Sequence, residues 1–146
     1  MHPKENIVLL VDADNNPIGE MEKLEAHRRG IMHRAVSVLV FDPKGRWLLH
    51  RRALGKYHAG GLWTNACCTH PFVNEEPREA VRRRLFEEMG MNITHDGLRH
   101  LFDFTYRAEL DNGLIEHEYD SVFVYTTPIK PVPNPEEVMD WRCIDM

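Results

Sequence analysis

The sequence lacks long apolar runs and an excess of basic charge. Its 146 residues contain only strand-sized apolar stretches, whereas a membrane-spanning helix needs about 20 consecutive apolar residues. We therefore expect no membrane contact. The formal net charge of -5 provides no general basic surface, so nucleic acid is not the expected partner. An anionic substrate would need a local basic pocket.

A disulfide framework is also missing. The chain has three cysteines, an odd number, and two of them are adjacent, as Cys67 and Cys68. This usage favours a reducing cytoplasm. The start "MHPKENIVLLVDAD" shows no basic segment followed by an apolar run and a cleavage site, so we expect no secretory signal. With no repeat or linker, the length predicts one domain over residues 1–146, as a monomer or weak homo-oligomer.

Apolar patterning predicts several strands and one long helix. Strands are expected at 6–12, 35–42, 46–52 and 62–70, on both sides of the "DNG" turn at 111–113, and in the tail. The segment 21–33 is predicted to be a short helix or an irregular loop. A helix covers about 75–89, with Asn74 as its cap, Pro77 near its start and Gly90 as its stop. Several strands around one helix predict an α+β domain.

The stretch "GLWTNACCTHPF" at 61–72 holds two thiols and an imidazole. Because side chains alternate along a strand, Cys68 and His70 share one face and Cys67 points to the other. A structural zinc site would need a second Cys/His pair, which Cys143 alone does not provide. An acid/base or nucleophilic role for Cys68 is favoured, since a nearby cation or metal lowers the pKa of a thiol.

A second concentration of polar groups lies in the predicted hairpin. Glu116 and Glu118 share a strand face, where two carboxylates repel unless the face is solvated or a cation lies between them. A three-residue loop at 111–113 would place Tyr106 opposite Glu118. A two-residue loop would place it opposite Tyr119 instead. The residues alone leave both the solvation and the register open.

The roles of the histidines and of the charged residues on the predicted helix are ambiguous when each is considered alone. His27 and His33 are six positions apart, which is not a helical ligand spacing. Together with His70 and the two glutamates, however, they would suit Zn²⁺, Mn²⁺ or Mg²⁺. On the predicted helix, Arg84 and Glu88 are four apart and share a face. A salt-bridged, solvated surface is the simplest interpretation of that pair, and of Arg82 and Arg83.

The helix sequence "EEPREAVRRRLFEEMG" resembles the signature helix of the Nudix superfamily. It departs from that pattern where Thr69 replaces the first glycine and where Arg84 replaces a glutamate. A Nudix pyrophosphohydrolase holds magnesium with its glutamates. Exchanging one carboxylate for a cation removes a metal ligand and supplies a diphosphate contact, which argues against hydrolysis.

One branch of that superfamily fits from about residue 6 onward. The strings "WTNACCTHP", "HRAVSVLVF", "RRALGK", "FTYRAEL", "IEHEYDSVFV" and "NPEEVMDW" together resemble the type I isopentenyl-diphosphate isomerases. The resemblance implies a Nudix-like fold, with a mixed sheet packed by helices around the helix at about 75–89. It also implies interconversion of isopentenyl and dimethylallyl diphosphate through a tertiary carbocation, in isoprenoid biosynthesis. Members of this family usually have a further C-terminal segment with an aromatic residue that faces the carbocation.

The resemblance also assigns roles to individual residues. Cys68 and Glu118 would flank the double bond, with Tyr106 assisting proton delivery. The implied metal ligands are His27, His33, His70, Glu116 and Glu118, while Glu88 and the Cys68 carbonyl would hold a second ion, Mg²⁺. The implied diphosphate contacts are Lys23, Arg52, Lys56 and Arg84. No organic cofactor is expected. The alternatives are a Nudix-type pyrophosphohydrolase and a non-catalytic domain that binds diphosphate or metal.

Overall fold

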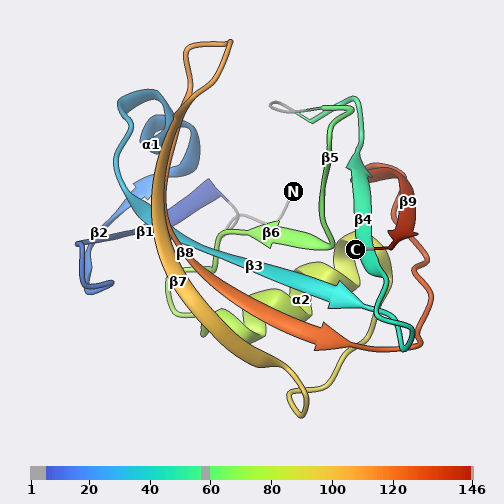
Figure 1. Cartoon of the computed structure of the whole chain (residues 1–146). Helices are drawn as coiled ribbons and strands as arrows, with labels where there is room; N and C mark the ends of the chain where they lie inside the picture. Colours follow the sequence, from blue (N-terminus) through green and yellow to red (C-terminus); the bar gives the residue numbers. More distant parts are fainter. Residues whose placement is uncertain (1–5, 57–59, 146) are drawn as a thin grey trace.

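The computed structural model describes residues 6–56 and 60–145, which form one nine-stranded sheet with two helices (Figure 1). The strands are β1 (Ile7–Val11), β2 (Pro17–Glu22), β3 (His33–Phe41), β4 (Trp47–Arg52), β5 (Trp63–Asn65), β6 (Cys67–Thr69), β7 (Arg99–Glu109), β8 (Ile115–Thr126) and β9 (Val138–Ile144). The helices are α1 (Lys23–Arg29) and α2 (Pro77–Met89). The α+β prediction is confirmed.

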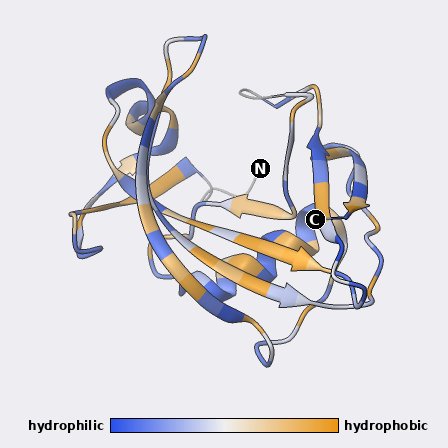
Figure 2. Cartoon of the chain, in the orientation of Figure 1, coloured by the Kyte–Doolittle hydropathy of each residue, from blue (hydrophilic) through white to orange (hydrophobic). Residues whose placement is uncertain are grey.

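Strand β3 organises the sheet. It pairs in parallel with β8, and antiparallel with β1, β4 and β6. The long β7–β8 hairpin curves along one side, while β4 pairs with β5 and β9 on the other (Figure 1). Hydrophobic residues concentrate on β3, β6 and the middle of β8, in front of α2 (Figure 2). Within the described ranges, no helix is long and apolar enough to cross a membrane.

Helix α2 closes the core with one apolar stripe. Ala80, Val81, Leu85 and Met89 are fully buried, because positions four apart and their direct neighbours form one stripe along a helix. The helix begins at Pro77 rather than at 75, and its N-cap is Glu76. The prediction of Asn74 as the cap is therefore wrong, because a proline favours the first helical position and moves the cap to the residue before it.

The end of α2 depends on Gly90, which has φ +63° and donates its N–H to the carbonyls of Leu85 and Phe86. A Cβ at Gly90 would overlap the carbonyl oxygen of Val132. We expect Gly90→Ala to lower the free energy of unfolding by about 2–4 kcal/mol, from backbone strain and this overlap together.

Gly113→Ala is the matched control for Gly90→Ala, and urea unfolding is the measurement. Gly113 has φ +78°, yet a Cβ there would meet nothing within 4 Å. Its substitution should cost only about 1 kcal/mol, from the left-handed backbone alone. Equal losses for the two variants would contradict a steric role for the Val132 carbonyl.

The β7–β8 hairpin settles the register that the sequence left open. Its loop has three residues, with Gly113 in the left-handed region and Leu110 N–H donating to Leu114 O. Tyr106 therefore lies opposite Glu118. The expected strand at 62–70 is divided at Ala66 into β5, which pairs with β4, and β6, which pairs with β3.

Candidate active site

The site forms on one face of the sheet where β6, β3, β8 and β7 lie side by side. His33 on β3 is opposite Glu118 on β8, which is opposite Tyr106 on β7. Ser37 on β3 is opposite Cys68 on β6. Directly opposed residues share a face, and residues two apart on one strand do so as well. All five side chains therefore lie on the same side of the sheet.

Three histidines and a glutamate gather at one end of this face. They are His27, His33, His70 and Glu118, and their ligand atoms all lie within 4.8 Å of one another. The Nδ1 atoms of His27 and His33 lie 2.7 Å and 2.9 Å from backbone carbonyl oxygens. A carbonyl only accepts, so each Nδ1 carries a hydrogen and each Nε2 presents a lone pair when the ring is neutral.

The donor set fits a divalent cation. Nε2 of His33 and Nε2 of His70 are only 3.2 Å apart, a distance at which two lone pairs need a proton or a cation between them. Burial lowers the pKa of His70 to about 4, which keeps the ring neutral and able to ligate a metal. Glu116, predicted as a fifth ligand, lies outside this group, and its Oε2 accepts instead from the Tyr106 hydroxyl at 3.2 Å.

The expected Tyr106–Glu118 contact is present. The Tyr106 hydroxyl donates to Glu118 Oε1 at 2.5 Å, while Glu118 Oε2 lies 2.8 Å from His70 Nε2. Burial by itself raises the pKa of Glu118, but the imidazoles of His33 and His70 beside its carboxylate hold that pKa well below its usual range. Burial and the neighbouring Glu118 carboxylate both raise the pKa of Tyr106. Glu118 is thus an ionised acceptor beside a protonated phenol.

Cys68 lies in a cavity of about 290 Å³ with most of the predicted site residues. Those lining the cavity are Lys23, Arg52, Lys56, Cys68, His70, Arg84, Glu88, Tyr106, Glu116 and Glu118. His27 and His33 are buried beside His70. Solvent reaches Cys68 through the cavity, yet the surrounding walls desolvate the thiol and raise its pKa to about 11. The cavity thus joins a thiol, a phenol–carboxylate pair and four cationic side chains.

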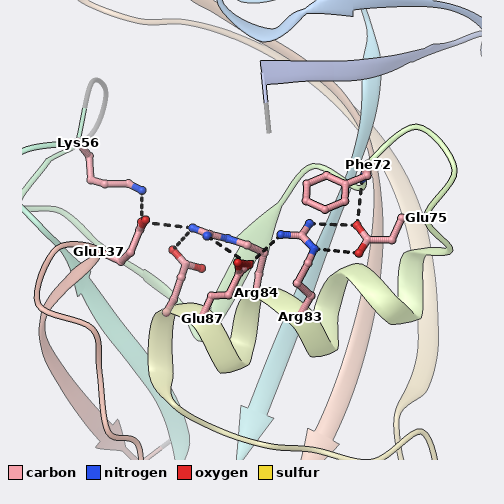
Figure 3. A network of polar contacts seen from close by, with 8 residues as sticks. Lys56, Phe72, Glu75, Arg83, Arg84, Glu87 and Glu137 are labelled. Atoms are coloured by element: carbon pink, nitrogen blue, oxygen red, sulfur yellow. Dashed lines mark hydrogen bonds and ion pairs between the residues drawn. The ribbon is translucent and has the colours of Figure 1, made fainter. Parts of the chain in front are cut away.

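Acidic partners hold two of the cationic side chains, Lys56 and Arg84, in place (Figure 3). One Arg84 nitrogen contacts Glu88 at 3.1 Å and Glu137 at 3.2 Å, and the Lys56 ammonium also pairs with Glu137. Burial raises the pKa of Glu88, opposed by Arg84. The second Glu88 oxygen, Oε1, is buried without a hydrogen-bond partner. An orphaned carboxylate oxygen beside this cationic cavity fits the predicted Mg²⁺ ligand.

Arg83 is not the solvated surface residue that its spacing predicted. Its guanidinium lies 3.8 Å from the centre of the Phe72 ring and makes two bonds to Glu75, at 2.8 Å and 3.0 Å (Figure 3). It thereby ties α2 to the loop before it and borders a neighbouring cavity of about 570 Å³. Arg82 matches the prediction, since it pairs with Glu79 near the surface.

Sequence reasoning missed three polar residues that contact the site. Glu137 bridges Lys56 and Arg84, Ser37 contacts Cys68, and Asp120 contacts Ser37. Strand alternation could have placed Ser37 on the same face as His33, four positions earlier. The partners of Glu137 and Asp120 come from distant segments, so no local spacing indicates them.

Known proteins resemble the chain in sequence. A family model described as the NUDIX domain matches residues 31–146. Isopentenyl-diphosphate Delta-isomerase 2 of Aromatoleum aromaticum is 50% identical over 142 residues, covering 97% of this chain and 74% of that protein. The protein named isopentenyl-diphosphate Delta-isomerase in Burkholderia multivorans is 49% identical, covering 97% and 79%. That in Pectobacterium atrosepticum is 48% identical, covering 92% and 74%.

Solved structures resemble the chain in fold. DR0079 from Deinococcus radiodurans superimposes with a TM-score of 0.73 at 18% identity, covering 94% of this chain and 82% of that one. The MutT protein from Methanosarcina mazei gives a TM-score of 0.62 at 19% identity, covering 77% and 76%. Likenesses at such low identity concern the fold alone, and they confirm the predicted Nudix-like architecture.

Proposed function

Because this chain belongs to the isopentenyl-diphosphate Delta-isomerases of the NUDIX domain family, it is an isomerase of isopentenyl diphosphate, and we propose that Cys68 and Glu118 form its acid/base pair. The observation that carries this assignment is one cavity lined by Cys68, Glu118, Tyr106 and cationic side chains. Isopentenyl and dimethylallyl diphosphate differ only in the position of one double bond. The reaction therefore needs one proton added and another removed, with no net redox change.

In this proposal the Tyr106–Glu118 pair delivers the proton that is added to the double bond. An unactivated alkene is a weak base, so its protonation needs a positioned acid and stabilisation of the tertiary carbocation. The short hydrogen bond between the phenol and the carboxylate places one proton between two oxygens at the cavity wall. Ionised Glu118 and nearby Glu116 also supply negative charge beside the developing cation.

Cys68 acts as the general base that removes the second proton. Solvent reaches the Cys68 thiol through the cavity and accepts its proton. The resulting thiolate takes a proton from the carbon next to the cationic centre, and the freed C–H electron pair forms the new double bond. The bound substrate must displace water from the cavity, because water would otherwise capture the cation as an alcohol. Lys23, Arg52, Lys56 and Arg84 would hold the diphosphate and so fix the alkene between sulfur and phenol.

The His/Glu cluster would hold a divalent metal. His27, His33, His70 and Glu118 provide three imidazoles and a carboxylate, a set better suited to Mn²⁺ or Zn²⁺ than to Mg²⁺. When bound, the ion would supply positive charge that makes Glu118 and its hydrogen-bonded phenol more acidic. Glu88 and the Cys68 carbonyl would hold a Mg²⁺ that contacts the diphosphate.

The three cysteines of this chain are free thiols, and we therefore also propose that the enzyme works in the reducing cytoplasm.

Incubation with isopentenyl diphosphate and Mg²⁺ in heavy water tests the proposal. Isomerisation by these residues should yield dimethylallyl diphosphate carrying deuterium, together with deuterium in the recovered substrate. Release of phosphate or pyrophosphate would instead indicate a pyrophosphohydrolase. Binding without any conversion would indicate a non-catalytic domain. Either of the last two results would overturn the proposed function.

Glu137 provides a prediction about substrate binding. Its carboxylate pairs with both Lys56 and Arg84, so an incoming diphosphate must compete with it for these cations. We expect Glu137→Gln to bind inorganic pyrophosphate about fivefold more tightly, equivalent to about 1 kcal/mol, by calorimetry. Glu136→Gln is the control, since it removes the same charge from a neighbour that makes no ion pair with either cation. Weaker binding by Glu137→Gln would contradict competition.

A further inference from the structure

Ser37 and Asp120 form a buried polar pair, and Ser37 of this pair contacts Cys68. Ser37 Oγ lies 3.5 Å from Cys68 Sγ and 2.9 Å from Asp120 Oδ2. Ser37 is only 6% exposed and Asp120 only 5%. Neither residue has a role in the reaction described above, although both lie on the same face of the sheet as Cys68 and Tyr106, on the two strands between them.

The chemistry of the three groups fixes the direction of their hydrogen bonds. A serine hydroxyl has one hydrogen and two lone pairs. The single Ser37 hydrogen has two acceptors within reach, Asp120 Oδ2 and Cys68 Sγ. While Cys68 is a thiol, the carboxylate is the stronger acceptor, so the hydrogen points to Asp120 and the thiol donates to Ser37 Oγ. When Cys68 is a thiolate, the Ser37 hydroxyl donates to the sulfur instead. Thr64 Oγ1 lies 3.8 Å from the same sulfur.

Asp120 is poorly explained as a stabilising residue. Its Oδ1 is buried without a hydrogen-bond partner, and burying an unsatisfied carboxylate oxygen disfavours folding. The residue opposite Asp120 on β3 is Ala35, whose side chain offers no hydrogen-bond donor. The contact that Asp120 does make, through Oδ2, is the one that orients Ser37. The geometry therefore connects Asp120 to Cys68 through Ser37.

We propose that Ser37, oriented by Asp120, is a positioning residue that holds the Cys68 sulfur toward the carbon from which it removes a proton. The inference rests on the proposed function, because it concerns the proton-removal step. In that step the proton moves to sulfur while its electron pair forms the double bond. The new S–H then rotates toward Ser37 Oγ, which draws the proton away from the product and favours forward reaction over return.

The test is how the carbocation divides between product and substrate in heavy water. A cation that loses its neighbouring proton to Cys68 becomes deuterated dimethylallyl diphosphate, whereas a cation that reverts becomes deuterated isopentenyl diphosphate. In Ser37→Ala we expect kcat to fall about tenfold, with KM within about twofold. The ratio of deuterium in recovered substrate to deuterium in product should rise at early conversion. Ser37→Thr, which keeps the hydroxyl, should restore the wild-type ratio.

Ser121→Ala is the matched control, because Ser121 is a serine of equal burial on β8 that faces away from the cavity, next to Asp103. It should leave the ratio unchanged. Adding Asp120→Ala to the Ser37→Ala variant should have little further effect on the deuterium ratio. Asp120 acts through the hydroxyl that Ser37→Ala has already removed. A crystal structure of Ser37→Ala should show Cys68 in a second χ1 rotamer, a readout that does not depend on activity.

A failure of the proposed function and a failure of the positioning role give different results. If the wild-type protein neither isomerises nor exchanges deuterium, the proposed function fails. If the wild type isomerises and Ser37→Ala keeps its deuterium ratio and its single Cys68 rotamer, the positioning role is overturned. Should Ser37→Ala not fold, Asp120→Asn provides the same test, because its amide can donate to Ser37 and redirect the hydroxyl. An unchanged ratio in that variant would equally overturn the role.

Discussion

Cys68→Ala is expected to lower kcat for isomerisation by about 1,000-fold, while deuterium still enters the recovered substrate in heavy water. The variant removes the only sulfur that lines the described cavity but leaves the Tyr106–Glu118 pair intact. The carbocation can then form and revert, whereas no group is positioned to take the neighbouring proton. Loss of product with retained exchange would separate proton removal from proton addition.

Cys67→Ala is the control for this result. Cys67 is fully buried in the core under β3, although it is the immediate neighbour of Cys68. Its truncation should reduce stability by about 1 kcal/mol and leave kcat within a few-fold of wild type. Mass spectrometry of intact protein verifies each substitution, and a cooperative thermal unfolding transition verifies that both variants are folded. Full isomerisation by Cys68→Ala would contradict the proposed acid/base assignment.

The difference between the two cysteines was predictable because strand alternation is local. A period of two along a strand places Cys68 and His70 on one face and Cys67 on the other, whatever the strand pairs with. The same rule placed Glu116 and Glu118 together. It could not decide whether Tyr106 faces Glu118, because that depends on the conformation of Gly113 in the turn.

The partners of charged residues were the least predictable from the residues alone. Arg83 has the spacing of a surface helix residue, yet the loop before α2 folds back and supplies Phe72 and Glu75 to it. Glu137 reaches Arg84 from a segment more than 50 positions later in the chain. Such contacts follow from the path of the chain in space, which helical spacing does not encode.

The metal cluster was likewise only partly predictable from the sequence. His33 and Glu118 meet because β3 and β8 pair in parallel, a long-range pairing with no local signal. His27 joins them from α1, whose carbonyls fix its tautomer. Their residue types grouped them beforehand as a set suited to a divalent metal, and the resemblance to a known family assigned them as ligands. It also connected Glu116, which the structure leaves outside the cluster, so its role as a ligand stays a prediction.

Glu118→Gln should abolish both activity and metal binding. The amide keeps the shape of the carboxylate but carries no charge, so it neither balances a divalent cation nor accepts strongly from Tyr106. We expect kcat to fall by at least about 1,000-fold and metal content, by elemental analysis of purified protein, to fall by at least about tenfold. Glu116→Gln in parallel tests the fifth ligand, since a true ligand should also lose metal.

Asp103→Asn is the matched control for Glu118→Gln. Asp103 is a carboxylate of the same hairpin, but it faces away from the cavity, where it accepts from His100 and Tyr119. Its substitution changes the net charge equally and should leave metal content and kcat close to wild type. Two outcomes would contradict the combined role of Glu118. If Glu118→Gln kept its metal but lost activity, Glu118 would serve only in proton transfer. If it lost the metal but retained kcat, the ion would have no part in making Tyr106 and Glu118 acidic.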